Sequence, residues 1–167
     1  MNDYREHLLQ AEILIVDDNA ANVRVLERML ATAGYRHVEG VTDPREVVPL
    51  CQAQRFDLIL LDIRMPHLDG FEVMAELAKL ITDDYLPVLV LTAQTDNETR
   101  LRALREGAKD FLNKPFDQDE VLNRIRNMLE VRLLHNQIRD HNALLEEEVR
   151  ERTADLRQAL LAAEAAS

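Results

Sequence analysis

The sequence predicts an α/β protein with a doubly wound, five-stranded parallel sheet, followed by a long C-terminal helix. Five short apolar segments alternate with helical patterns before residue 117, and such alternation is typical of βα repeats that build a parallel sheet. After Asp117 the sequence contains no glycine and no proline, so one uninterrupted helix is expected there.

The strands are expected where apolar residues follow one another without alternation. The segments EILIVD (12–17) and DLILLD (57–62) have this pattern, which is typical of strands that are covered on both faces of a sheet. The five expected strands cover residues 12–17, 36–41, 57–62, 86–92 and 109–112.

The helices between these strands have recognisable start and stop signals. Four capping residues are each followed three positions later by a glutamate, which is the spacing of a capping box. These residues are Asp43, Asp69, Thr95 and Asp117. Gly34 and Gly107 fall where helices are expected to end. Because the signals recur at the expected places, they support the βα repeat.

The C-terminal segment is expected to change its role along its length. As one helix, residues 118–167 would extend about 75 Å. Its first part is apolar enough to pack on the sheet, through Val121, Leu122, Ile125, Met128 and Leu129. We therefore divide the chain into an N-terminal extension (1–10), an α/β domain (11–130) and a helical tail (131–167).

The tail carries a thinner apolar stripe whose members are spaced three and four residues apart. They are Leu134, Ile138, His141, Leu145, Val149, Arg152, Leu156 and Leu160. This spacing predicts a coiled coil, and the two four-residue steps from His141 to Val149 break a strict heptad as a stutter does. We expect a parallel homodimer; a solvated single helix is the alternative. The alanine-rich end, 159–167, is expected to fray.

Three acids are expected at one edge of the sheet. Asp17 and Asp18 follow the first strand and Asp62 ends the third, and the carboxyl ends of parallel strands form the ligand-binding edge of such folds. Clustered carboxylates repel one another without a cation. Oxygen ligands suit Mg²⁺, so the sequence predicts a magnesium site suited to phosphoryl chemistry.

Two further residues are expected at the same edge. Thr92 ends the fourth strand, and Lys114 follows the fifth in the segment KDFLNKPF. Taken singly, either residue would be read as an ordinary strand or surface residue. Together with the three acids they form a set of charged and hydroxyl groups that can contact a phosphoryl group.

At this point the sequence resembles the receiver domain of bacterial two-component response regulators. The resemblance covers residues 11 to about 130 and rests on four segments in order: VDD (16–18), LDIRMPHLDG (61–70), LTA (91–93) and KPF (114–116). It implies a flavodoxin-like fold with strand order 2-1-3-4-5. It also implies a switch in signal transduction and no catalysis beyond the chain's own phosphorylation and dephosphorylation.

The resemblance also implies a role for each residue of the set. Asp62 would accept the phosphoryl group from a sensor histidine kinase or a phosphotransfer protein. Asp17, Asp18, Asp62 and the carbonyl of Arg64 would hold Mg²⁺. The phosphoryl oxygens would be contacted by Lys114, Thr92 and the amide of Ala93, and Phe111 would be the switch aromatic that turns inward when Thr92 moves. The Lys114–Pro115 bond is expected to be cis.

The tail resembles the signalling helix that joins receivers to enzymatic outputs of the HD-GYP, GGDEF or histidine kinase type. The residues that carry this likeness are LLEEEVRERTADL (144–156). The chain has no motif of such an output, so we expect it to be part of a longer regulator. A cyclic-di-GMP phosphodiesterase of the HD-GYP type is the first expectation for the output.

Composition limits the remaining function classes. The net charge of -11 disfavours a nucleic-acid partner, because the phosphate backbone is also negative. A single cysteine, Cys51, excludes an internal disulfide and is expected as a small core residue. No segment has the length of a signal peptide's apolar region or of a membrane span. We therefore expect a cytoplasmic protein without a membrane partner.

Two other function classes remain open on sequence alone. A phosphatase of the haloacid dehalogenase kind would need an acid two residues after its nucleophile, where Arg64 stands. A coiled-coil adaptor that is never phosphorylated is the second alternative, and the complete set of site residues argues against it.

Overall fold

The structure, a computed structural model, describes residues 2–80, 85–93 and 97–166. It divides into two compact units, Met1–Arg132 and Leu133–Ser167. The first unit contains the sheet and the helices that cover it, and the second is helical throughout its described residues.

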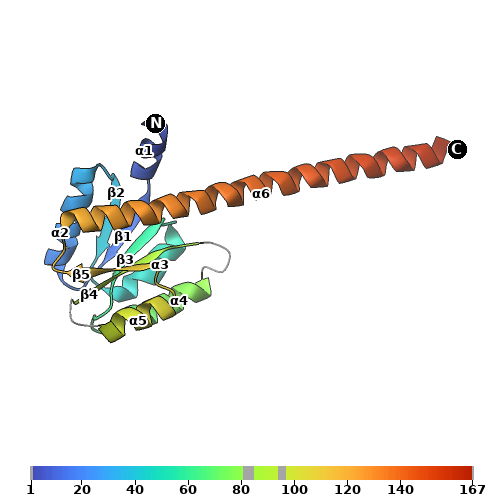
Figure 1. Cartoon of the computed structure of the whole chain (residues 1–167). Helices are drawn as coiled ribbons and strands as arrows, with labels where there is room; N and C mark the ends of the chain where they lie inside the picture. The colour runs from blue at the N-terminus through green and yellow to red at the C-terminus, as the bar shows by residue number, and fades with distance from the viewer. Residues whose placement is uncertain (1, 81–84, 94–96, 167) are drawn as a thin grey trace. The chain divides into compact units, whose positions relative to one another are not determined.

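The sheet of the first unit has five parallel strands in the order β2-β1-β3-β4-β5, which confirms the predicted fold (Figure 1). The strands are β1 (Glu12–Val16), β2 (His37–Val41), β3 (Leu58–Asp62), β4 (Val88–Ala93) and β5 (Asp110–Lys114). In the register of the sheet, Asp62 pairs with Leu91 and Ala93 pairs with Lys114. The polar ends of the strands therefore lie at one edge.

Helices cover both faces of this sheet (Figure 1). They are α1 (Asn2–Leu9), α2 (Ala20–Ala33), the short η1 (Pro44–Glu46), α3 (Val47–Ala53), α4 (Gly70–Leu80), α5 (Asn97–Arg105) and α6 (Gln118–Ala166). The N-terminal extension contains a helix that the sequence did not predict: Leu8 of α1 is buried, and Leu9 lies against Gly34 at the end of α2.

The core is built from alternate residues of the central strands. Leu14 and Val16 of β1 share one apolar cluster with Ile59 and Leu61 of β3 and with Val73 of α4. The intervening strand residues, such as Ile13 and Leu60, are also completely buried. Burial on both faces explains why these strands read as continuous apolar runs.

The predicted helix signals are confirmed where the structure describes them. Asp43 caps η1 through the amide of Arg45, and Asp69 and Asp117 accept hydrogen bonds from the amides three residues later at 2.9 and 3.0 Å. Gly34 ends α2 in the left-handed conformation, with φ of 102°. The box that begins at Thr95 lies outside the described residues.

Cys51 is half-buried against the main apolar cluster, as predicted. Burial raises the pKa of its thiol to about 11, so the side chain is a neutral packing group near neutral pH.

The part of α6 in the first unit also packs as predicted. Val121, Ile125 and Leu129 are completely buried, and Leu122 is half-buried. Arg132, at the end of this unit, is buried as well, with 1% of its surface exposed. Its guanidinium bonds to the Asp57 carboxylate and to the carbonyls of Phe56 and Tyr85. The sequence analysis did not predict this buried charge.

The second unit is the remainder of α6. The helix continues through Ala166, so the expected fraying of the alanine-rich end was wrong up to that residue. Apart from the half-buried Leu133, the large apolar side chains of this unit are exposed: Leu134, Ile138, Leu144, Leu145, Val149, Leu156, Leu160 and Leu161. No helix in the described part of the chain is long and apolar enough to span a membrane.

Candidate functional site

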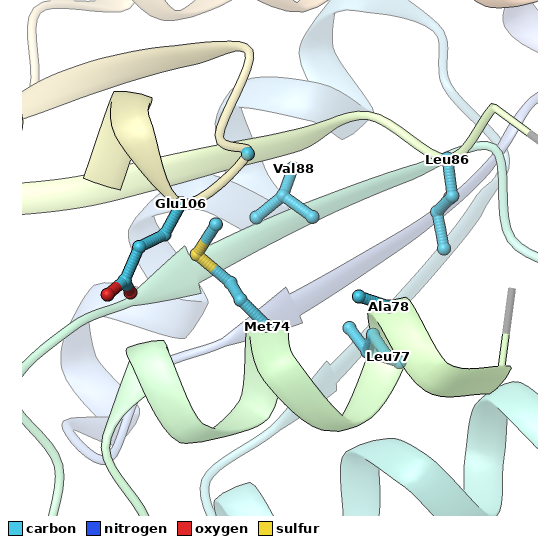
Figure 2. Close-up of a pocket in the computed structure, with 7 residues that line it drawn as sticks. Met74, Leu77, Ala78, Leu86, Val88 and Glu106 are labelled. Atoms are coloured by element: carbon cyan, nitrogen blue, oxygen red, sulfur yellow. The ribbon is translucent and has the colours of Figure 1, made fainter. Parts of the chain in front are cut away.

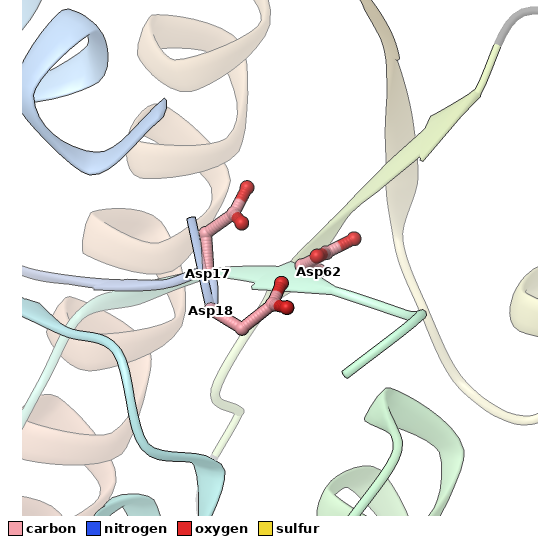
Figure 3. Close-up of side chains that lie close together, drawn as sticks. All are labelled: Asp17, Asp18 and Asp62. Carbon is pink, nitrogen blue, oxygen red and sulfur yellow. The ribbon is translucent and has the colours of Figure 1, made fainter. Parts of the chain in front are cut away.

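The three predicted acids and the predicted lysine come from three strands and meet at the carboxyl edge of the sheet. Asp17 and Asp18 follow β1, Asp62 ends β3, and Lys114 ends β5. The carboxylates of the three acids converge in Figure 3, and one oxygen of each lies within 4.8 Å of the others. The predicted convergence of the acids is therefore confirmed.

The three acids have different surroundings. Asp17 is fully buried and Asp62 is 5% exposed, whereas Asp18 is exposed. Burial of two carboxylates so close together is costly unless cations or hydrogen-bond donors compensate them. The donors around the cluster therefore decide what this site can do.

Lys114 supplies the compensating positive charge. Its Nζ lies 3.1 Å from Oδ2 of Asp17 and 3.2 Å from Oδ1 of Asp62, so one ammonium group bridges the two buried acids. Burial opposes the charge of Lys114, but the two carboxylates outweigh it and the pKa of the lysine is raised. The lysine stays protonated and can face a phosphoryl group at this position.

The surroundings of Asp62 oppose its ionisation. Burial, followed by the negative charge of Asp17, raises the pKa of the Asp62 carboxyl to about 7, against the smaller opposing effect of Lys114. A second cation at the cluster would favour the ionised, nucleophilic form of Asp62. The residues present therefore fit a divalent ion with oxygen ligands.

Asp17 is fixed by two residues that the sequence analysis did not single out. Its Oδ1 accepts from the amide of Asn19 at 2.9 Å, and its Oδ2 accepts from the side chain of Asn22 at 3.1 Å. Asn19 is also the N-cap of α2, through the amide of Ala21. A polar residue on the first turn after an acid pair is the sequence signal that could have indicated Asn22.

Thr92 and Phe111 lie on neighbouring strands. Thr92 is buried, and its Oγ1 donates to Oδ1 of Asn113 at 3.4 Å. Phe111 is half-buried, and the guanidinium groups of Arg100 and Arg124 lie 4.8 and 5.5 Å from its ring centre. The switch roles of Thr92 and Phe111 stay predictions.

The loop after Asp62 depends on a glycine. The amide of Gly70 donates to the carbonyl of Ile63 at 2.9 Å, and a Cβ on Gly70 would lie 2.6 Å from the backbone oxygen of Asp62. Any side chain there would displace the loop that carries Arg64.

Arg64 and Ala93 are both exposed near this edge. The predicted contacts of the Arg64 carbonyl with Mg²⁺ and of the Ala93 amide with the phosphoryl group stay predictions. The Lys114–Pro115 bond is cis, as predicted.

Comparison with known proteins agrees with this fold and site. Residues 13–126 match the response regulator receiver domain. The chain is 37% identical to response regulator PleD of Caulobacter vibrioides over 81% of its own length and 30% of that protein, and 43% identical to response regulator MprA of Mycolicibacterium vanbaalenii over 72% and 51%. The chain thus spans 30% and 51% of the length of these two relatives.

Solved structures give the same result. Chemotaxis protein CheY4 of Vibrio cholerae superposes with a TM-score of 0.66 at 32% identity, covering 71% of this chain and 98% of that one. NtrX from Brucella abortus gives a TM-score of 0.72 at 28% identity, covering 78% and 29%. The fold and site define a signal-transduction switch of the two-component class. The chain belongs to the response regulator receiver domain family.

Proposed function

We propose that this chain accepts a phosphoryl group on Asp62 from a sensor histidine kinase or a phosphotransfer protein. The observation that carries the proposal is the bridge from Lys114 to Asp17 and Asp62 within a cluster of three acids. Response regulators as a family receive their phosphoryl group from such donors, and the matched region includes every residue of this cluster.

The acid cluster would hold Mg²⁺ through Asp17, Asp18 and Asp62, with the carbonyl of Arg64 as a further ligand. When bound, the ion would neutralise charge on the transferring phosphoryl group and on the carboxylates around it. The fit rests on the donor set, which consists of oxygens that converge within 4.8 Å.

The protein's own side chains and backbone carry out the remaining steps of the phosphoryl transfer. An ionised Oδ of Asp62 attacks phosphorus, and the donor histidine departs with the electrons of the broken bond. Lys114, which already lies beside Asp62, pairs with the phosphoryl oxygens. The hydroxyl of Thr92 and the amide of Ala93 donate to the same oxygens. Thr92 would then leave Asn113, and Phe111 would turn inward.

The phosphorylated state would be relayed through α6. The exposed apolar side chains of the second unit support a parallel homodimer formed through residues 131–160, because a second copy would bury them. The chain would act in the cytoplasm as a switch, without catalysis on other substrates. Its output would be a domain of a longer protein, with a cyclic-di-GMP phosphodiesterase as first candidate.

The assignment of Asp62 is tested by phosphorylation with acetyl phosphate and magnesium, followed by mass spectrometry of the intact protein. We expect one added phosphoryl group, which is lost in Asp62→Asn and in EDTA. The matched control, Asp140→Asn, changes an exposed acid of the second unit and should be modified normally. Modification that survives Asp62→Asn, or that needs no divalent ion, would refute the assignment.

A further inference from the structure

Eight residues of the second unit, six of them exposed and apolar, repeat every eleven positions along the helix. One row consists of Leu134, Leu145 and Leu156, a second of Ile138, Val149 and Leu160, and a third of His141 and Arg152. We call these eight residues the α6 stripe. Eleven residues make three turns at about 3.67 residues per turn, close to the 3.6 of an undistorted helix. The stripe therefore stays on one face of a nearly straight helix.

The surface of this helix has a hollow in the middle of the stripe. It is lined by Asn142, Leu145, Glu146 and Val149, with Arg150 at its side. The first four occupy positions i, i+3, i+4 and i+7, the arrangement of the four-residue hole that receives one side chain of a facing helix. Leu145 is the least exposed of the apolar stripe residues, at 45%. A side chain of a facing helix can therefore enter this hollow.

We propose that the α6 stripe binds a second copy of this chain in a parallel, in-register pair with eleven-residue packing. Leu145 of each chain enters the hollow of the other. In a parallel pair, a side chain at a d position n packs among residues n-3, n, n+1 and n+4 of the facing helix. For Leu145 these are the four residues that line the hollow. The inference rests on the dimer in the proposed function and adds its geometry.

The charges beside the stripe favour the parallel direction. At eleven residues per three turns, Glu148 and Asp155 lie on one side of the stripe, and Arg150 and Arg157 lie on the other. Glu146 lies on the same side as the two arginines, one turn before Arg150. In a parallel pair opposite sides of the two stripes face each other, so Glu148 and Asp155 of one chain face the side of the other that carries Arg150 and Arg157 together with Glu146. In an antiparallel pair like sides meet, which places Glu148 and Asp155 of both chains together.

The third row of the stripe can be covered without leaving a lone charge. Arg152 forms an ion pair with Glu148 of its own chain at 2.8 Å. A buried cation is tolerated when a neighbouring anion compensates it. This pair accounts for an arginine within an otherwise apolar contact surface.

Heptad packing would place a different set of residues in the contact. A heptad with Ile138 and Leu145 at its a positions continues to Glu148, Arg152, Asp155 and Ala159, and would bury two acids. A heptad with Ile138 and Leu145 at its d positions passes instead through Asn142, Val149, Leu156 and Ala159. Leu160 lies in the contact only in the eleven-residue packing, whereas Ala159 lies in it in both heptads, so this adjacent pair separates the two geometries.

The geometry is tested by single cysteines in the full chain, in a Cys51→Ser background that removes the native thiol. We expect rapid oxidation to a disulfide-linked dimer for Val149→Cys, Leu156→Cys and Leu160→Cys. The adjacent controls, Glu148→Cys, Asp155→Cys and Ala159→Cys, should cross-link slowly. Rapid cross-linking of Ala159→Cys in place of Leu160→Cys would overturn the eleven-residue packing but leave the dimer intact. Equal slow oxidation at all six positions, with a monomeric mass in light scattering, would overturn the dimer too.

The role of Leu145 is tested by Leu145→Gln, with Leu144→Gln as its matched control. Both residues are exposed leucines of one helix, but Leu144 lies outside the stripe. We expect Leu145→Gln to raise the dissociation constant of the dimer about a hundredfold, because a two-fold contact loses the side chain twice. Leu144→Gln should leave it unchanged. Equal effects in analytical ultracentrifugation would refute the hollow as the contact. Phosphorylation of Asp62, measured separately, does not depend on either result.

Discussion

The two units of this chain contain the same kinds of apolar side chain in opposite situations. In the first unit Leu60 and Leu61 are completely buried, whereas in the second unit the exposed fractions of Leu145 and Leu156 are 45% and 72%. The first unit buries its own apolar side chains, because helices cover both faces of its sheet. The second is a helix whose apolar stripe is exposed. Fold and site thus reside in the first unit, and the surface of the proposed dimer in the second.

Charged residues show the same contrast between buried and exposed positions, and replacing single arginines by alanine tests it. Arg132→Ala should lower the unfolding free energy of the first unit by about 3 kcal/mol, because it removes a buried cation from Asp57 and from two carbonyls. Arg157→Ala, at an exposed position of the second unit, should change it by less than about 0.5 kcal/mol.

Urea unfolding followed by tyrosine fluorescence measures this difference. The chain's three tyrosines, Tyr4, Tyr35 and Tyr85, all lie in the first unit, so their signal reports that unit alone. Equal midpoints for the two variants would show that Arg132 is not a structural anchor.

The two adjacent acids of the site should also differ, although both would bind the same ion. In EDTA, Asp17→Ala should lower stability by about 2 kcal/mol, since its carboxylate accepts from Asn19 and Asn22 and pairs with Lys114. Asp18→Ala removes an exposed like charge and should raise stability by at most about 1 kcal/mol. Thermal melts without metal give the comparison; a clear loss of stability in Asp18→Ala would contradict it.

Histidine-to-glycine exchanges should have opposite signs in the two units. His67 has φ of 70°, a left-handed conformation that strains residues with a Cβ. His67→Gly should therefore stabilise the first unit by about 0.5 kcal/mol after the added freedom of the unfolded chain is subtracted.

His141 lies within regular helix. His141→Gly should therefore weaken the second unit by about 1 kcal/mol, which circular dichroism would record as lost helicity. Thermal melts measure the His67→Gly variant, and a loss of stability there would show that the side chain contributes more than its backbone strain costs.

Local patterns were sufficient to predict much of the fold and the acid cluster. Asp17 and Asp62 were placed correctly because each ends an apolar run, and parallel strands bring such ends together whatever the loops between them do. Asp43, Asp69 and Asp117 were predictable as caps, since a cap depends only on residues within one turn. Glu148 and Arg152 are also close in sequence, and their ion pair in the second unit follows from helix periodicity.

Other features were decided only by tertiary structure. Arg132 meets Asp57 across 75 positions of sequence, and no local pattern distinguishes this arginine from the exposed ones around it. Lys114 was expected beside the acids, but its bridge between Asp17 and Asp62 depends on the register of three strands.

The sequence by itself therefore determined the strands, the caps and the edge at which the site forms, because those signals act between neighbours in the chain. The tertiary structure decided which polar groups are buried together and which apolar residues stay exposed. Burial depends on all the elements that pack around a position, and a single segment contains no record of them.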